Sequence, residues 1–153
     1  MANTYFQMYV QTVFPVKYRK ALLHESWKRE VFAVLANLIQ ESGCKAFIVN
    51  GMEDHVHCFF GLKPSLTVSD IMKNVKAKSS KWLNETGYLD HRFAWQPGFG
   101  SFTYSHSHVD SVFNYILNQE KHHKKLSFRD EYTKMLHKFN VDFDERYIFH
   151  DPL

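Results

Sequence analysis

The sequence predicts a single compact domain of the α+β class. Its 153 residues, of which 44% are hydrophobic and 16% aromatic, suffice for one buried core without help from a disulfide or a metal. Segments with the two-residue period of a strand alternate along the chain with segments that have the period of a helix. No repeat, low-complexity tract or linker rich in proline, glycine or serine interrupts them, so we interpret residues 1–153 as one domain.

Aromatic and β-branched residues mark the expected strands, which fall at residues 5–13, 45–49, 55–60 and, for one short strand, within 93–104. Apolar residues three and four positions apart mark the expected helices, at residues 27 to about 39, from the cap at Thr67–Asp70 to an end at Gly87, at about 108–124 and at about 128–138. The helix over about 108–124 carries Tyr115. The last helix begins a C-terminal extension over about 127–153, whose tail has no clear period.

Local motifs define several element ends. Thr67–Asp70 and Ser107–Asp110 both have the capping-box pattern that starts a helix, and Gly87 is expected to end one. Between the second and third strands, the pair Asn50 and Gly51 favours a turn with positive φ. We therefore expect these two strands to form a hairpin.

Charge and cysteine content limit the functional class. Nineteen Lys and Arg against sixteen Asp and Glu give a net charge of +3, so phosphate binding would need local basic patches. Cys44 and Cys58 form neither a CxxC pair nor a dense disulfide scaffold, which indicates a reducing cytoplasm. No stretch approaches the roughly 18 apolar residues of a membrane span, so we expect a soluble protein without a membrane partner.

The clearest chemical feature is a pair of histidines two residues apart. His55 and His57 lie in an expected strand and would present both imidazoles on one face, while Val56 and Cys58 face the other way. That geometry suits a shared metal ion and disfavours a His-His-Cys zinc site. The alternative is two histidines that are satisfied within the core or face solvent.

A second feature lies in the helix expected over about 108–124. Tyr115 and Gln119 are one turn apart and lie away from the apolar stripe of that helix, so a phenol and an amide oxygen could reach one site. The alternative is an exposed aromatic beside an exposed amide. Because a phenol with a pKa of about 10 is a weak nucleophile, phosphoryl transfer from DNA would need an ion to polarise the phosphate, and the histidine pair could supply it.

Other histidines and lysines allow more than one interpretation. His106 and His108 repeat the spacing and compete as a metal site, although their position before a helix start favours a loop or capping role. Phosphate contacts are expected from lysines on outward helix faces, although such charges are also typical of solvated surfaces. The candidates are Lys73, Lys76, Lys121 and Lys124.

Several motifs, taken together and in order, resemble the HUH-type single-tyrosine transposases of the insertion sequence 200/605 class. The two central ones are Asp54-His55-Val56-His57 and Tyr115-Ile-Leu-Asn-Gln119. The flanking segments that also resemble this family are Val13–Arg19, Trp95–Phe102, His122-His123, Phe128–Glu131 and Asp144–Tyr147.

The resemblance implies a ferredoxin-like antiparallel sheet with helices packed on one face, the HUH nuclease core. It implies that His55, His57 and Gln119 bind Mg²⁺ or Mn²⁺ and that Tyr115 is the nucleophile. The expected reaction is cleavage and rejoining of single-stranded DNA at insertion-sequence ends through a 5′-phosphotyrosine intermediate, without a nucleotide cofactor. The expected partners are DNA with subterminal hairpins and a second copy of the chain in a homodimer.

Two other functions stay open at this stage. A domesticated relative would process repeated chromosomal hairpins with the same chemistry, and only the flanks of the gene would distinguish it. A non-catalytic, ferredoxin-like nucleic-acid-binding module would use the histidines and Tyr115 as contacts to bases or phosphates. Metal-independent binding without cleavage would favour that module.

Overall fold

The computed structural model describes residues 3–148. Its strands are β1 (Tyr9–Pro15), β2 (Lys45–Gly51), β3 (His55–Gly61) and β4 (Gly100–Tyr104). Its α-helices are α1 (Lys28–Glu41), α2 (Val68–Thr86), α3 (Val109–Leu117), α4 (Gln119–His122) and α5 (Phe128–Lys138). Two short 3₁₀ helices are η1 (Lys17–Arg19) and η2 (His106–His108).

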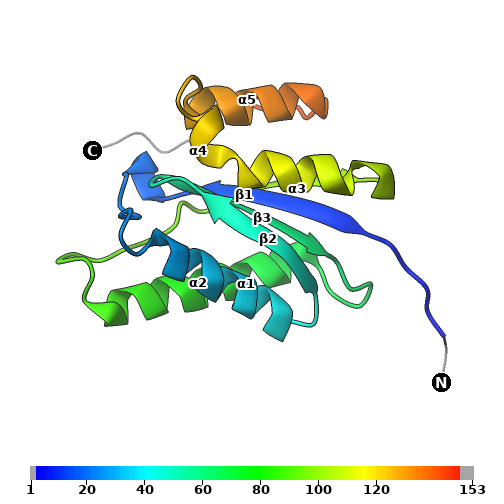
Figure 1. The fold of residues 1–153 in the computed structure, drawn as a ribbon, viewed down its shortest axis with the longest axis horizontal. Helices are drawn as coiled ribbons and strands as arrows, with labels where there is room; N and C mark the ends of the chain where they lie inside the picture. The colour runs from blue at the N-terminus through cyan, green and yellow to red at the C-terminus, as the bar shows by residue number, and fades with distance from the viewer. Residues whose placement is uncertain (1–2, 149–153) are drawn as a thin grey trace.

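The four strands form one antiparallel sheet in the order β2-β3-β1-β4 (Figure 1). β1 pairs with β3 from Tyr9 opposite Gly61 to Pro15 opposite His55, and β1 pairs with β4 along its other edge. Pairing begins at Tyr9, whereas the sequence predicted a strand from residue 5. The earlier start was wrong because residues 3–8 have no neighbouring strand and are exposed, Tyr5 at 90%.

Helices cover both faces of the sheet, with α1 and α2 on one face and α3, α4 and α5 on the other (Figure 1). The expected antiparallel sheet is confirmed, but the expectation of helices on one face is wrong. Six consecutive residues of β3, His55–Phe60, are buried, so both sets of alternating side chains need cover. Val56, Cys58 and Phe60 join the core with α1 and α2, whereas Phe59 packs under α3.

The hairpin and the cap of α2 form as the sequence predicts, with one difference. The Thr67 hydroxyl accepts a hydrogen bond from the Asp70 N–H, and Gly87 ends α2 at φ 77°. Gly51, however, does not have a positive φ and lies within β2. It is required by close approach, because a Cβ there would collide with the carbonyl oxygen of His55 and lie 2.8 Å from Val56 Cα.

The helix predicted over about 108–124 is two helices, broken at Asn118 (φ −96°, ψ 27°). The side-chain amide of Asn50 donates to the carbonyl oxygens of Ile116 and Leu117 and so occupies acceptors that a continuing helix would need. The predicted Ser107 cap is also wrong. The chain makes the turn η2 first, and α3 then begins after His108 without a side-chain cap.

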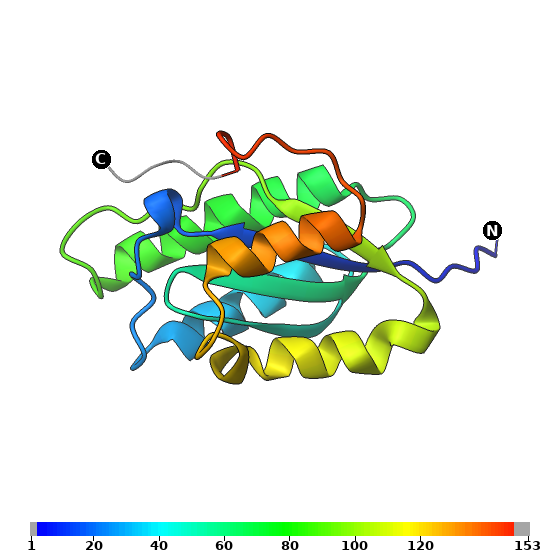
Figure 2. The ribbon, with the colours of Figure 1, turned by 90° about the horizontal axis from the view of Figure 1, so that it is seen from above.

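At α5, the Ser127 hydroxyl accepts from the Asp130 N–H, and the helix covers the predicted residues 128–138. In the view from above, α5 (orange) lies over the sheet and runs roughly along β1, with α3 and α4 (yellow) to one side (Figure 2). Of the C-terminal extension expected to residue 153, residues 149–153 lie outside the described part of the chain. Among residues 3–148, no helix combines the length and apolar character that crossing a membrane requires.

Candidate active site

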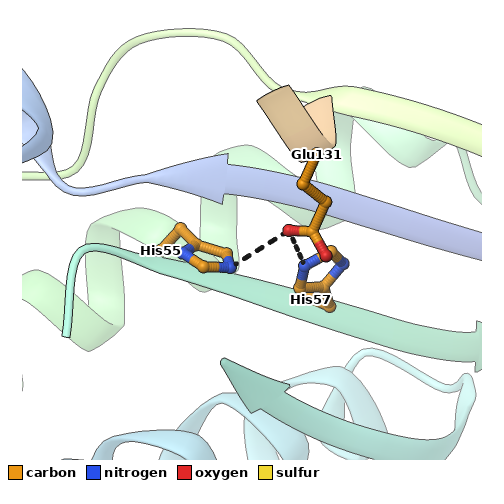
Figure 3. Close-up of side chains that lie close together, drawn as sticks. All are labelled: His55, His57 and Glu131. Atoms are coloured by element: carbon orange, nitrogen blue, oxygen red, sulfur yellow. Dashed lines mark hydrogen bonds and ion pairs between the residues drawn. The ribbon is translucent and has the colours of Figure 1, made fainter. Parts of the chain in front are cut away.

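β3 presents His55 and His57 side by side on the face covered by α3, α4 and α5. Both side chains are fully buried, and their ring centroids are 5.2 Å apart. The two-residue period of the strand produces this arrangement, as the sequence predicts, and it directs Val56 and Cys58 into the opposite core. The two imidazoles therefore share one enclosed site (Figure 3).

Each imidazole is oriented through its Nδ1 atom by an oxygen from a neighbouring segment. His55 Nδ1 lies 2.7 Å from Asp54 Oδ1, at the start of β3. His57 Nδ1 lies 2.7 Å from Oε1 of Gln11, which is buried on β1. Oxygen partners at Nδ1 favour rings that carry the Nδ1 proton and direct Nε2 into the site.

α3 and α4 bring Tyr115 and Gln119 to the same site. Gln119 is fully buried, with its Oε1 atom 3.1 Å from His55 Nε2. The Tyr115 hydroxyl donates to Oε2 of Glu131, and Gln119 Nε2 donates to the same oxygen over 3.1 Å. The four predicted chemical residues, His55, His57, Tyr115 and Gln119, thus converge in this structure.

The centre of the convergence is Glu131, in the first turn of α5. Its Oε1 atom lies 3.0 Å from His57 Nε2 and 3.3 Å from His55 Nε2 (Figure 3). The same oxygen is 3.0 Å from Nε2 of His123, whose Nδ1 lies 2.6 Å from the Leu126 carbonyl oxygen. A carboxylate that is only 1% exposed therefore joins β3 to the tyrosine-bearing helix.

Burial and charge set the protonation of these groups. Burial opposes charging of His55, but its contacts with Asp54 and Glu131 outweigh burial and raise its pKa to about 9. Burial lowers the pKa of His57, an effect that Glu131 partly offsets. Burial alone would raise the pKa of Glu131, but the surrounding imidazoles hold it well below its usual range, so this side chain is a carboxylate.

Tyr115, unlike Glu131, is favoured in its protonated form. Its burial, followed by the negative charge of Glu131, raises the pKa of the phenol above its usual value of 10. The ring also stacks on His122, with centroids 4.6 Å apart and planes 26° apart. In the resting site, Tyr115 is therefore a protonated phenol held by stacking and by one hydrogen bond.

The residues at this centre fit a divalent cation. Ligand atoms of His55, His57 and Glu131 all lie within 4.8 Å of one another, and Gln119 adds a nearby oxygen. Two imidazole nitrogens with carboxylate or amide oxygens are a donor set that suits Mn²⁺ and can hold Mg²⁺.

The second His-x-His pair does not join this centre. His106 and His108 are exposed in η2, where His106 Nδ1 lies 3.1 Å from the Tyr9 hydroxyl and His108 Nδ1 lies 2.8 Å from the Ser105 hydroxyl. These contacts agree with the loop interpretation of the sequence.

The four candidate DNA-contacting lysines fall into two groups. Lys73 and Lys76 lie on α2, across the sheet from the site, and Lys76 Nζ donates to the carbonyl oxygens of Gln96 and Gly98 over 2.6 Å each. Lys121 and Lys124 are exposed in and just after α4, on the side of the site. Lys121 also lines a cavity of about 1040 Å³ that Tyr115 and Glu131 border.

Comparison with known proteins identifies the family. The family described as "Transposase IS200 like" matches residues 4–119, well over half of the chain. The chain belongs to the IS200-like transposase family. This membership confirms the resemblance recognised in the sequence motifs.

Two curated relatives of this IS200-like chain are the transposases for insertion sequence element IS200 of Salmonella typhimurium and Salmonella typhi. Each is 28% identical over 85 residues. The match spans 56% of this chain and 56% of the relative, so this chain covers only about half the length of either relative.

Two solved structures share the fold. A putative transposase from Deinococcus radiodurans R1 is 20% identical, covers 78% of this chain and 95% of its own, and has a TM-score of 0.62. A REP-associated tyrosine transposase bound to a REP hairpin is 13% identical, and the match covers 82% of this chain and 74% of that one, with a TM-score of 0.60.

Glu131, His123 and Gln11 are site residues that sequence reasoning did not assign. In this IS200-like chain Glu131 lies beyond the matched residues 4–119. A signal was present: Phe128, Glu131 and Met135 lie at helical spacing on the buried side of α5, so a carboxylate interrupts an apolar stripe. Buried carboxylates are rare unless they are paired, which marks such a residue as a candidate site residue.

Proposed function

We propose that this chain is a metal-dependent single-tyrosine DNA transposase that cleaves and rejoins single-stranded DNA at insertion-sequence ends. One observation carries the proposal: the hydroxyl of Tyr115 and the imidazoles of His55 and His57 meet at the same carboxylate, Glu131. A possible nucleophile and a possible cation site are thus adjacent, and family membership supports the same chemistry.

His55 and His57 would hold the cation, Mg²⁺ or Mn²⁺, with an oxygen from Gln119 or Glu131. When bound, such an ion polarises a phosphate oxygen and offsets the charge that develops on the phosphate. Asp54 and Gln11 keep both rings turned toward the site.

Tyr115 would attack the scissile phosphorus through its hydroxyl oxygen. The new bond is a 5′-phosphotyrosine ester, the bond broken is that to the 3′-oxygen, and that oxygen leaves as a hydroxyl after taking up a proton. Before attack, the phenolic proton is directed at Glu131 Oε2, and stacking on His122 fixes the ring. One phosphoester replaces another, so the freed 3′-hydroxyl can reverse the step without a nucleotide cofactor.

The single strand would lie in the cavity that borders Tyr115, between α3 and α4 on one side and α5 on the other. Four lysines from the two walls line it: Lys121, Lys125, Lys134 and Lys138. Three aromatic rings besides Tyr115 also line it: Tyr104, His122 and Phe139. Basic grooves with aromatic platforms suit single-stranded nucleic acid, because the lysines contact phosphates and the rings stack on bases.

The remaining partners follow from the family. We propose recognition of subterminal hairpins, which is supported by the solved relative described as bound to a REP hairpin. We also propose a homodimer, as the resemblance implies, and action in the cytoplasm, which the cysteine content indicates.

The test is covalent capture. Labelled single strands from the flanks of the gene would be incubated with the protein, with and without Mg²⁺ or Mn²⁺, and adducts that resist denaturation would be separated on a gel. We expect a cation-dependent adduct that Tyr115→Phe abolishes. Tyr88→Phe is the matched control, because Tyr88 is exposed and bonds Glu30, away from the site.

Two results would contradict the proposal. An adduct of unchanged yield with Tyr115→Phe would exclude Tyr115 as the nucleophile. Tight, cation-independent binding to cognate strands with no adduct would instead favour the non-catalytic binding module.

A further inference from the structure

We propose that Glu131 is a third protein ligand of the cation, so that α5 completes a His-His-Glu centre together with β3. The inference rests on the proposed function, since the cation is the one assigned there to His55 and His57. Glu131 lies outside residues 4–119, which the family match covers, and so the match does not assign it this role.

The first argument is position. Glu131 Oε1 is 3.0 Å from His57 Nε2 and 3.3 Å from His55 Nε2, and the three ligand atoms lie within 4.8 Å of one another (Figure 3). All three side chains are at most 1% exposed. Imidazole and carboxylate atoms that close together are near enough to share one ion.

The second argument is the direction of the imidazoles. His55 and His57 each place Nδ1 against an oxygen acceptor, Asp54 Oδ1 and Gln11 Oε1 respectively. With Nδ1 fixed in this way, both Nε2 atoms face into the site, toward the oxygen of Glu131. A proton on each Nε2 can bridge these contacts in the metal-free site, and a cation that displaced those protons would bind the same three atoms.

The third argument is that Glu131 is held in place by a residue outside the proposed ligand set. His123 Nε2 contacts Oε1 over 3.0 Å, and His123 Nδ1 is fixed by the Leu126 carbonyl at 2.6 Å. His123 is therefore a positioning residue. Within residues 3–148, the ion-pair partners of Glu131 are His55, His57 and His123.

A consequence is that one carboxylate serves both the cation and the nucleophile. While Oε1 faces the two imidazoles of β3, Oε2 accepts hydrogen bonds from the Tyr115 hydroxyl and from Gln119 Nε2. Binding of a cation at Oε1 would therefore fix the orientation of the Glu131 carboxylate, which accepts the hydrogen bond from Tyr115.

The test is a Mn²⁺ titration without DNA, followed by calorimetry or by the loss of the free Mn²⁺ signal in electron paramagnetic resonance. We expect Glu131→Gln to raise the Kd for Mn²⁺ at least about tenfold, as loss of a ligand or of its close support does. Asp130→Asn is the matched control, because it removes the same charge from an exposed neighbour on α5 and should leave the Kd unchanged. Glu131→Asp keeps the charge but shortens the side chain, and an intermediate Kd is expected.

Circular dichroism and the Tm of the metal-free variants would establish that they are folded. If Glu131→Gln does not fold, the Kd of Glu131→Asp for Mn²⁺ is used in its place. A folded Glu131→Gln variant with the Kd of the unmodified protein would overturn the inference. If His55→Ala loses Mn²⁺ in that case, the proposed function stands and only the role of Glu131 falls. Absence of Mn²⁺ binding by the unmodified protein would overturn both this inference and the proposed metal dependence, while adduct formation tests Tyr115 independently.

Discussion

The side chain of Asn50, near the end of β2, donates hydrogen bonds to the carbonyl oxygens of Ile116 and Leu117, over 2.9 and 3.3 Å. These bonds cap the last turn of α3, where the chain breaks before α4 begins with Gln119. Gln119, the first residue of α4, is fully buried and contacts His55 and Glu131. A residue of the hairpin thus determines where the tyrosine-bearing segment bends.

Asn50→Ala should therefore loosen the junction between α3 and α4. Loss of the two bonds is expected to lower the free energy of unfolding by about 1–2 kcal/mol, measured by urea denaturation. Asn37→Ala, at an exposed position of α1, is the control and should change it by less than about 0.5 kcal/mol. Equal effects of the two substitutions would mean that the junction does not depend on Asn50.

Gly51→Ala should be destabilising although alanine is ordinarily compatible with a strand. The added Cβ would collide with the His55 carbonyl oxygen, and overpacking of this kind typically costs about 1–3 kcal/mol. Gly61→Ala is the matched control, because its Cβ would meet the Phe47 ring at 3.6 Å and Lys45 Cβ at 4.0 Å, both ordinary contacts. The Tm of both variants would be compared, and a Gly51→Ala protein as stable as Gly61→Ala would refute the close-approach explanation.

The basic cavity beside Tyr115 predicts salt-dependent binding of single strands. The double substitution Lys121→Ala with Lys134→Ala removes one cation from each wall and should weaken binding about tenfold at low salt. The slope of log K against log salt should fall by about 1.4, since each phosphate contact on a single strand contributes about 0.7. Fluorescence anisotropy with a labelled oligonucleotide would measure both quantities.

The control for that experiment is Lys73→Ala with Lys78→Ala on α2, which lies on the opposite face of the sheet from α3, the helix that carries Tyr115 (Figure 1). This double variant changes the net charge by the same amount as the cavity variant, and it should alter the slope of log K against log salt much less. If the two double variants weaken binding to the same extent, net charge rather than the cavity governs the interaction.

Lys76 predicts a pH dependence of stability. Burial lowers the pKa of its ammonium to about 8 from the ordinary value of 10.5. Between these values the unfolded chain holds more protons than the folded one, so this group increases stability as pH rises from about 8 to 10.5. The free energy of unfolding should therefore rise over that window relative to Lys76→Met, as urea titrations at several pH values would show. A constant difference between the two proteins would rule out a buried, titrating Lys76.

The sequence by itself determined those features that depend on local period. The alternation of a strand places His55 and His57 on one face, and the phase of a helix places Tyr115 and Gln119 away from the apolar stripe. Thr67 and Gly87 mark the ends of α2 for equally local reasons, a side-chain cap and a left-handed backbone.

Only the tertiary structure decided which of these faces meet. The break at Asn118 depends on Asn50, far away in the chain, and the convergence on Glu131 depends on α5 folding back over β3. The cover on the second face of the sheet likewise came from helices that follow it in sequence. Periodicity specifies the direction of a side chain relative to its own element, whereas the partner of that side chain depends on packing between elements distant in sequence, which no local pattern encodes.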